Sequence, residues 1–366
     1  MWIYAYAVMF GLALALSLAA TPLARRAARW FGVLDLPGDR KLQRAPIPLL
    51  GGAAVFGSVA GALLAGSAAA FLARRNPAVA SLIPLPVLAY LRNALSVFPR
   101  VVVILLGGLT IFLIGLWDDM SDLKPRAKLL GQILMALGVV CLDVRITLFS
   151  RNYFFTTALT VAWIVVITNA FNLLDNMDGL CAGVALIASG LFFGISAFKE
   201  HYFIAILLAV FAGSLLGFLR YNFSPAVIFL GDAGSMFIGY FIAVLTIMQT
   251  YYSPASGGPL SVLMPLVILA VPLYDTVSVV IIRALRGQSI FTGDKRHFSH
   301  RLVTLGMSQR GAVCFIYLVT LCTGLAATFL PRVGWLGGAV VLTQTILTVS
   351  LIAVLEYFGK KRSGDA

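Results

Sequence analysis

Residues 168–180 read TNAFNLLDNMDGL and separate two long apolar segments. A bilayer tolerates ionised side chains only at its edge or in a cavity, so the stretch predicts a turn at one face of a membrane-spanning bundle. If the turn is locally helical, Asn172, Asp175 and Asp178 recur at i, i+3 and i+6 and project from neighbouring parts of one face. Three oxygen-bearing side chains would then converge on one place.

The composition is that of a polytopic membrane protein. Apolar residues make up 60% and charged residues 11% of the 366-residue chain, and the mean hydropathy is strongly positive, which lies outside the range of soluble domains. We predict an all-α protein with about 11 transmembrane helices, because each apolar segment is near the ~20 residues that a helix needs to cross hydrocarbon. The predicted spans, which together form one domain over residues 1–366, are 2–24, 51–73, 99–117, 127–147, 153–174, 180–198, 201–219, 232–251, 261–285, 311–330 and 334–358.

The distribution of basic residues predicts the orientation. With the N-terminus outside, 19 of the 27 Lys and Arg residues fall in cytoplasmic segments and 8 in external ones. This excess supports an outer N-terminus and a cytoplasmic C-terminus. Because the net charge of +13 is spread over alternate loops, we attribute it to anionic lipid and a phosphorylated substrate and expect no nucleic-acid partner. Residues 74–98, broken by prolines, are expected to form an external insertion, and 286–310 a cytoplasmic basic and histidine-containing loop.

Most acidic side chains fall on the predicted cytoplasmic side. Adjacent residues of a helix diverge by about 100°, so Asp118 and Asp119 suit two tasks better than one. No cluster of Cys and His offers a zinc site, whereas aspartates with an Asn suit Mg²⁺ or Mn²⁺, which share their coordination shell with substrate phosphates. The sequence therefore predicts a divalent cation together with a diphosphate. The carboxylates, with Asp275 inside the ninth predicted span, are Asp118, Asp119, Asp122, Asp175, Asp178, Asp232 and Asp294.

Purely structural roles stay open for three of these carboxylates. Asp232, in the GDAGS stretch at 231–235, opens a span and would either cap the helix or belong to an anion-binding site. Asp178 would either cap the following helix or serve the site. Asp275 would either serve the site or pair with Arg283 two turns on.

The segment 286–310 concentrates cations and two of the three histidines of the chain. If residues 294–303 form a helix, His297, His300 and Arg301 share one face at i, i+3 and i+4. Such a cation-rich turn beside a metal would neutralise a phosphoryl group in transit. The alternative is a basic loop that lies on anionic lipid.

Six ordered motifs carry a resemblance to a known family. They are Arg40-Lys41 with Gly51-Gly52, Asp118-Asp119 with Lys128, Asn172 with Asp175 and Asp178-Gly179, Asn222 with Phe229–Asp232, Pro272 with Asp275, and Asp294 with His297 and His300-Arg301. In this order the chain resembles the polyprenyl-phosphate N-acetylhexosamine-1-phosphate transferases of glycosyltransferase family 4. This family includes the bacterial enzymes that start peptidoglycan lipid, O-antigen and teichoic-acid linkage-unit synthesis.

The resemblance implies a reaction at the cytoplasmic face of the bacterial inner membrane. The phosphate of a polyprenyl phosphate, typically undecaprenyl phosphate, would attack the β-phosphorus of a UDP-N-acetylhexosamine and give UMP and a polyprenyl-diphospho-sugar. One phosphoanhydride replaces another, so catalysis must come from positioning and charge neutralisation. The form of the histidine motif favours UDP-GlcNAc as the donor. Mg²⁺ or Mn²⁺ would be the cofactor, and a homodimer is one candidate assembly.

The resemblance also implies roles for individual residues. The metal ligands would be Asp232, Asp119 and Asp175. The catalytic residues would be Asp118, Asp119, Asp175, Asp178, Lys128, His297 and His300. The substrate-binding residues, among which Phe229 would stack on uracil, would be Asn172, Asn222, Phe229, Arg40, Lys41 and Arg301. Attack by an Asp in two steps and action of an Asp as a base in one step both stay open.

The chain departs from the family pattern at three places. The histidine motif usually reads His-x-His-His, and Ser299 stands in the place of the middle histidine. Asn176-Met177 replaces a common Gly-Leu, although the Asp-x-x-Asp spacing is kept, and Gln43 stands where many members have His.

Three other functions are the alternatives. They are phospho-MurNAc-pentapeptide transfer in peptidoglycan synthesis, a multipass transporter, and a non-catalytic lipid-binding member of the family. Transporters usually place polar residues at mid-membrane on interrupted helices within inverted repeats, whereas the carboxylates here collect at one face.

Overall fold

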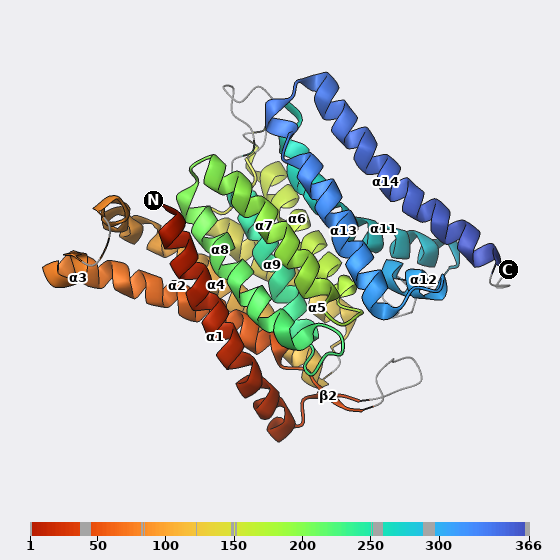
Figure 1. The fold of residues 1–366 in the computed structure, drawn as a ribbon, viewed down its shortest axis with the longest axis horizontal. Coiled ribbons are helices and arrows are strands. Elements are labelled where there is room, and N and C mark those ends of the chain that lie inside the picture. The colour runs from red at the N-terminus through yellow and green to blue at the C-terminus, as the bar shows by residue number, and fades with distance from the viewer. Residues whose placement is uncertain are drawn as a thin grey trace.

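The computed structural model describes residues 2–36, 45–81, 83, 85–121, 123–147, 150, 152–249, 251, 259–287 and 297–362. These residues form a bundle of long helices with one very short strand pair (Figure 1). Within the described ranges, nine helices are long and apolar enough to cross a membrane, or ten if the bent pair at 260–268 and 270–285 is one span. The predicted all-α, polytopic membrane protein is therefore confirmed.

The elements of the described residues follow in chain order. The helices are α1 Trp2–Phe31, α2 Gly51–Arg75, α3 Pro77–Ser81, α4 Leu85–Ser121, α5 Pro125–Cys141, α6 Tyr153–Leu174, α7 Leu180–Phe198, α8 Tyr202–Asn222, α9 Gly231–Met248, α10 Met264–Ile268, α11 Ala270–Leu285, α12 Phe298–Thr304, α13 Gln309–Ala327 and α14 Trp335–Arg362. Short 3₁₀ turns cover Pro259–Leu263 and Leu330–Arg332. The strands β1 (Leu34–Asp35) and β2 (Ile47–Pro48) pair antiparallel, with Leu34 opposite Pro48.

The observed helices differ from the predicted spans in length and continuity. Helix α5, Pro125–Cys141, has 17 residues, about 26 Å of helix, so it is shorter than the span predicted at 127–147. The predicted span at 261–285 is bent by 70°; Pro272 lacks the N–H that would continue the first helix, so the break precedes it. Residues 85–98 are continuous with the rest of α4. The predicted segment 74–98 is thus largely helical.

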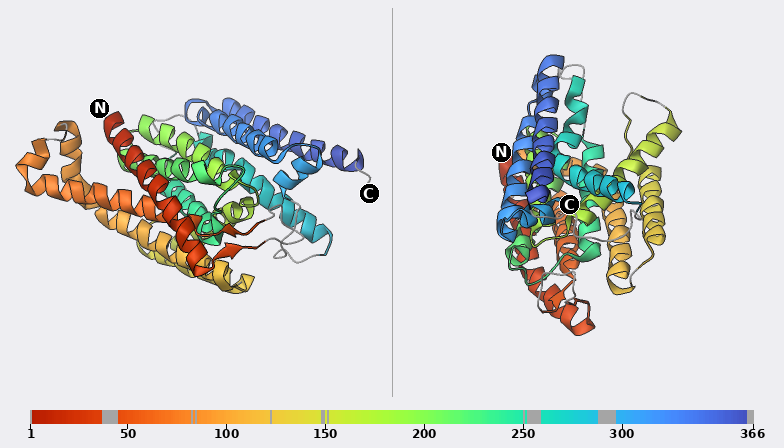
Figure 2. Two further views of the ribbon diagram at one scale, coloured as in Figure 1. Left: turned by 60° about the horizontal axis from the view of Figure 1, so that its bottom comes forward. Right: turned by 90° about the vertical axis from the view of Figure 1, so that its right-hand side faces the viewer.

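Helix α9 lies at the centre of the bundle (Figure 1). It packs against α2, α4 and α6 and also touches α7 and α8. Nearly all its side chains are buried, and Phe237 and Phe241 pack on Phe211 of α8. A helix that is apolar all round requires such a central place. Helix α1 packs along α8 and α2, while α14 lies beside α13 at the outside of the bundle (Figures 1 and 2).

Glycines let the backbones of α2 and α9 meet. A Cβ on Gly234 would lie 2.7 Å from Gly52 Cα, and the atoms nearest to a Cβ on Gly52 would belong to Gly234. Only residues without a side chain allow this approach. The N–H of Gly51 donates to Phe229 O, and the N–H of Gly52 donates to Leu230 O, both at 2.9 Å. The first turns of α2 and α9 are therefore fixed against each other.

One end of the bundle gathers the ends of six helices. Consecutive long helices run in opposite directions, so α4, α6 and α8 end where α5, α7 and α9 begin. The three connections α4–α5, α6–α7 and α8–α9 meet at this end. These connections and the helix turns beside them carry most of the carboxylates that the sequence analysis singled out.

Candidate active site

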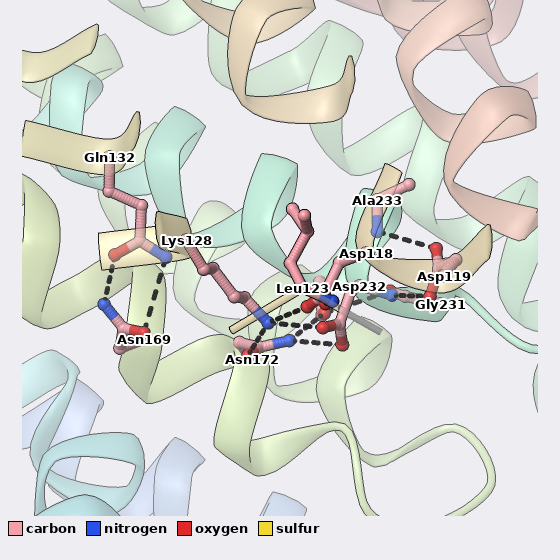
Figure 3. Close-up of polar contacts among 11 residues, drawn as sticks. Asp118, Asp119, Leu123, Lys128, Gln132, Asn169, Asn172, Gly231, Asp232 and Ala233 are labelled. Atoms are coloured by element: carbon pink, nitrogen blue, oxygen red, sulfur yellow. Dashed lines mark hydrogen bonds and ion pairs between the residues drawn. The ribbon is translucent and has the colours of Figure 1, made fainter. Parts of the chain in front are cut away.

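A lysine of α5 lies at the centre of a polar cluster (Figure 3). The Nζ of Lys128 lies 2.8 Å from Oδ2 of Asp118, near the end of α4. It also forms an ion pair with Asp232, in the first turn of α9, and donates to Oδ1 of Asn172 on α6 at 3.0 Å. Pro125 at the first position of α5 sets the start of that helix. The ammonium group thus lies among three oxygen atoms from three helices.

The amide of Asn172 joins α6 to α9. Its Nδ2 donates to Oδ1 of Asp232 at 2.8 Å and to Oγ of Ser235 at 2.9 Å. Because Oδ1 of Asn172 accepts from Lys128, both ends of the amide are engaged and its orientation is determined. We call Asp118, Lys128, Asn172 and Asp232 the lysine cluster. The four residues come from four helices, and the sequence analysis named all of them.

The carboxylate of Asp119 holds the first turn of α9. Its Oδ1 accepts from the N–H of Asp232 at 2.7 Å, and its Oδ2 accepts from the N–H of Ala233 at 3.0 Å. These N–H groups have no partner within the helix, and a negative charge is favourable there. The alternative in which Asp232 caps its own helix is therefore wrong. Asp118 and Asp119 thus have different partners: Asp118 pairs with Lys128, and Asp119 accepts from the first N–H groups of α9.

Gly231 allows the carboxylate of Asp119 to reach α9. Its φ is +70°, and a Cβ at this position would lie 2.5 Å from Asp119 Oδ2 and 2.6 Å from Leu49 O. We expect Gly231→Ala to lower the midpoint of thermal unfolding in detergent by roughly 5 °C, because the backbone conformation and the capping bonds are both disturbed. Gly190→Ala is the control, since a Cβ on Gly190 in α7 would meet nothing within 4 Å. Equal midpoints for the two variants would contradict the assignment.

The turn between α6 and α7 is not helical. Helix α6 ends at Leu174 and α7 begins at Leu180, so the helical face predicted for Asn172, Asp175 and Asp178 does not form. Asn172 stays on α6, whereas the two aspartates lie in the turn. The short turn nevertheless keeps all three at the same end of the bundle.

Asp178 ties this turn to the connection between α8 and α9. Its Oδ2 accepts from the N–H of Ala226 at 3.0 Å. The N–H of Gly179 donates to Oδ1 of Asn222 at 3.1 Å, and Nδ2 of Asn222 donates to the carbonyl of Ile228 at 3.0 Å. No side chain caps α7, so the capping alternative for Asp178 is also wrong. Asp178 and Asn222 fix the loop that leads to Phe229.

The turn contains two carboxylates, and only that of Asp178 accepts a hydrogen bond from the described part of the chain. The side chain of Asp175 has none there. Burial raises the pKa of Asp175 well above its ordinary range, and the nearby charges of Asp232, Asp119 and Asp178 raise it further. A cation beside these carboxylates would reverse that effect. A bound cation would therefore favour the ionised form of Asp175.

The ring of Phe229 lies next to the start of α9. Its backbone N–H donates to Pro48 O in β2 at 2.8 Å, and its carbonyl accepts from the N–H of Gly51 at 2.9 Å. Two bonds to the segment before α2 thus fix the backbone, and the side chain is half-buried. Stacking of Phe229 on uracil stays a prediction.

A buried aspartate of α11 fixes the start of the histidine segment. Asp275 is 1% exposed; its Oδ1 accepts from the N–H of Phe298 at 2.6 Å, and its Oδ2 lies 2.9 Å from Nδ1 of His297. Helix α12 begins at Phe298 and the backbone of His297 is extended. The predicted helix over 294–303 is therefore wrong at His297, which precedes the helix that carries His300.

The comparisons with known proteins place the lysine cluster in a family. The model of "Glycosyl transferase family 4" matches residues 101–250, which include all four members of the cluster. A "probable undecaprenyl-phosphate N-acetylglucosaminyl 1-phosphate transferase" of Bacillus subtilis is 34% identical over 332 residues, 88% of this chain and 84% of the relative. The chain belongs to glycosyl transferase family 4.

Two further relatives differ in how much of this chain they match. A "decaprenyl-phosphate N-acetylglucosaminephosphotransferase" of Mycobacterium tuberculosis is 31% identical over 336 residues, 82% of this chain and 76% of the relative. A "phospho-N-acetylmuramoyl-pentapeptide-transferase" of Thermoanaerobacter is 31% identical over 241 residues, 60% of this chain and 72% of the relative. The similarity to the named N-acetylglucosamine-phosphate transferases thus extends over more of the chain.

The family 4 site contains one polar pair that the sequence analysis missed. Gln132 and Asn169 exchange two amide hydrogen bonds, of 3.4 and 2.5 Å (Figure 3). They lie one turn from Lys128 and Asn172, respectively, and join α5 to α6 behind the lysine cluster. Gln132 follows Lys128 by four residues and Asn169 precedes Asn172 by three, so on a helix each lies on the same face as its neighbour in the cluster. This spacing could have identified the pair from the sequence.

The metal ligands that family membership suggests do not form a ready-made cage. In the ranges that the structure describes, no group of three or more His, Cys, Asp or Glu side chains is arranged to hold a metal ion. The donors at the site are nonetheless all oxygen atoms, and three of them already surround the ammonium of Lys128. A site that binds Mg²⁺ together with a diphosphate needs only one or two protein carboxylates. The residues present fit such a shared site.

The remaining predicted residues are not part of the lysine cluster. On α12, Nη2 of Arg301 donates to Oγ of Ser278 at 2.9 Å. The predicted residues Arg40, Lys41, Asp122 and Asp294 lie outside the described residues.

Proposed function

We propose that this protein transfers GlcNAc-1-phosphate from UDP-GlcNAc to a polyprenyl phosphate, releasing UMP and leaving a polyprenyl-diphospho-sugar in the membrane. The lysine cluster carries the proposal, because it lies within the family 4 match. The names of the relatives from B. subtilis and M. tuberculosis support GlcNAc-phosphate transfer to undecaprenyl or decaprenyl phosphate. This would be the first membrane step of cell-envelope polysaccharide synthesis.

The chemistry requires positioning more than covalent participation. An oxygen of the lipid phosphate forms a bond to the β-phosphorus, the anhydride bond to the α-phosphate breaks, and UMP leaves with the electron pair. Negative charge gathers on the transferred group, and fixed cations stabilise it. Lys128 supplies such a cation, and Asp118, whose Oδ1 accepts from the N–H of Leu123 at 2.8 Å, holds it in place. We assign Asp119 to positioning, because both its oxygens accept backbone N–H bonds.

Mg²⁺, or Mn²⁺ in its place, is the proposed cofactor. Asp175 and Asp232 would hold it. Asp119, the third ligand that the resemblance implied, is assigned to positioning instead, because both its oxygens accept backbone N–H bonds. When bound there, it would neutralise charge on the diphosphate of the donor. The all-oxygen donor set and the raised pKa of Asp175 support this assignment.

We place the site at the cytoplasmic face of the bacterial inner membrane. The proposed donor is water-soluble and the proposed acceptor is a lipid. A site at the ends of membrane-spanning helices lies at the boundary between water and lipid, where both can reach it. The excess of basic residues in the segments predicted to be cytoplasmic supports this orientation. Assembly as a homodimer stays a prediction.

Phe229→Ala is expected to raise the KM for the nucleotide sugar about 10-fold and to leave the KM for polyprenyl phosphate unchanged, because stacking of a base on an aromatic ring is lost. Initial rates of UMP release at varied concentrations of each substrate give the two constants. Phe154→Ala is the control, since Phe154 is 83% exposed at the start of α6, far from the cluster. Equal losses for both substrates would argue against stacking on uracil.

The experiment that tests the function is incubation of purified protein, Mg²⁺ and polyprenyl phosphate with a panel of UDP-sugars. UDP-GlcNAc is expected to give UMP and a lipid-linked product. Product only from UDP-MurNAc-pentapeptide would favour the other branch of the family. Failure of every UDP-sugar, combined with solute uptake by reconstituted vesicles, would favour a transporter.

A further inference from the structure

We infer that Ser299 and Asn176 form a positioning pair that docks α12 on the turn between α6 and α7. The inference rests on the proposed function and concerns how the histidine segment is placed at the same site. Oγ of Ser299 donates a hydrogen bond to Oδ1 of Asn176. Ser299 is 1% exposed, so the bond is shielded from competing water.

The hydrogen bonds of Asn176 fix the direction of this contact. Its Nδ2 donates to the carbonyl of Leu173 at 2.8 Å, which is a carbonyl in the last turn of α6 without a partner further along that helix. With the NH₂ group engaged there, the amide oxygen faces Ser299 and accepts only from a donor such as a hydroxyl. Asn176 therefore closes α6 and holds α12 with the two ends of one amide.

The pair joins two segments that carry proposed site residues. Asn176 directly follows Asp175, the carboxylate beside Asp119 and Asp232. Ser299 lies between His297 and His300 in the chain. A bond between Asn176 and Ser299 thus sets the distance between the carboxylates of the turn and two histidines, His297 before α12 and His300 within it.

Helix α12 depends on such anchors for its position. It has seven residues, too few for a helix to be stable by itself. Asp275 of α11 accepts from its first N–H group. Ser299 gives the helix a second attachment, to Asn176 in the turn between α6 and α7. Attachments to α11 and to the turn between α6 and α7 fix the place of this short helix, and hence where His297 before it and His300 within it lie.

Both members of the pair are departures from the family pattern. By the resemblance described above, Ser299 stands in the place of the middle histidine and Asn176 in the place of a common glycine, which has no side chain to accept a bond. In this chain the two departures meet in one hydrogen bond. We therefore assign the pair to positioning of the histidine segment toward the donor.

A double-mutant cycle tests the inference. Ser299→Ala, Asn176→Ala and the combined variant are compared for kcat and for the KM of UDP-GlcNAc and of polyprenyl phosphate. Each single change is expected to raise the KM of the donor about five-fold, as for loss of one buried hydrogen bond. The KM of the donor in the combined variant is expected to be no higher than in the single variant with the larger effect, because both changes remove the same bond. The KM of polyprenyl phosphate is expected to stay unchanged.

Thr304→Ala is the matched control. Thr304 is an exposed residue of the same helix, and its hydroxyl bonds the carbonyl of His300 within α12. This variant is expected to keep both KM values. The thermal midpoint is recorded for each variant, so that loss of folded protein is not mistaken for loss of binding.

The outcomes separate this inference from the proposed function. An active parent protein whose two single effects multiply in the combined variant, or whose two KM values change equally, would overturn the positioning pair alone. Single variants with unchanged kinetics would do the same. A parent protein that makes no UMP from any UDP-sugar would overturn the proposed function and this inference with it.

Discussion

Asp232→Ala is expected to abolish Mg²⁺-dependent release of UMP, with a fall in kcat of at least about 1,000-fold. Each carboxylate oxygen of Asp232 has a partner: Oδ2 pairs with Lys128 and Oδ1 accepts from Asn172. The change removes the ion pair between α9 and α5 and one of the two hydrogen bonds that Asn172 of α6 donates to α9. It also removes a proposed metal ligand. Both effects act on the charge that must be neutralised when phosphorus is transferred.

The control for this variant is Asp143→Asn. Asp143 is an exposed aspartate after α5, at the opposite end from the cluster. Its φ of 67° is a conformation that Asn also adopts readily, and the expected turnover is that of the parent protein. The measurement is UMP release in detergent over a range of Mg²⁺ concentrations. Turnover by Asp232→Ala near that of Asp143→Asn would remove Asp232 from the mechanism.

Lys128→Met is expected to lower kcat by about 100-fold, because the fixed cation at the centre of the cluster is lost. Asp118 and Asp232 would then face each other without the ammonium that separates them, and removing one partner of a largely buried ion pair leaves an uncompensated charge. The Lys128 side chain is 14% exposed. A methionine fills a similar volume, so packing of α5 is preserved and the change reports on charge.

Lys128→Arg separates charge from shape. A planar guanidinium does not reproduce a compact ammonium among three oxygens, so this variant is expected to recover only part of the lost rate. Lys124→Met, one turn earlier and exposed, is the control and is expected to retain the rate. Full activity of Lys128→Met would show that the ammonium has no part in the reaction.

Three members of the lysine cluster, Asp118, Asn172 and Asp232, could be predicted because the membrane restricts where polar groups lie, whereas Lys128 was named only through the family resemblance. Ionised side chains at the ends of long apolar segments meet at the bundle's end, since alternate helices begin and end there. For this reason Asp118, Asn172 and Asp232, far apart in the chain, could be assigned to one site before the structure was known. The strong hydropathy contrast made the helical class predictable in the same way.

The details that could not be predicted depend on tertiary contacts. The sequence contains capping signals at Asp178 and Asp232, but α9 is capped by Asp119 from another helix, and local spacing does not show this. The end of α6 at Leu174 and the extended backbone of His297 likewise depend on partners such as Ala226 and Asp275 that lie elsewhere in the chain. Helix length was overestimated for α5 because apolar composition continues beyond its last hydrogen-bonded turn.

The most direct test follows the phosphorus atoms. Purified protein is incubated with Mg²⁺, polyprenyl phosphate and UDP-GlcNAc labelled separately at the α- or the β-phosphate. The account predicts that the β-label enters the lipid fraction and the α-label leaves as UMP. Recovery of the β-label in UDP, with none in the lipid fraction, would show transfer of the sugar without its phosphate, and would contradict the account.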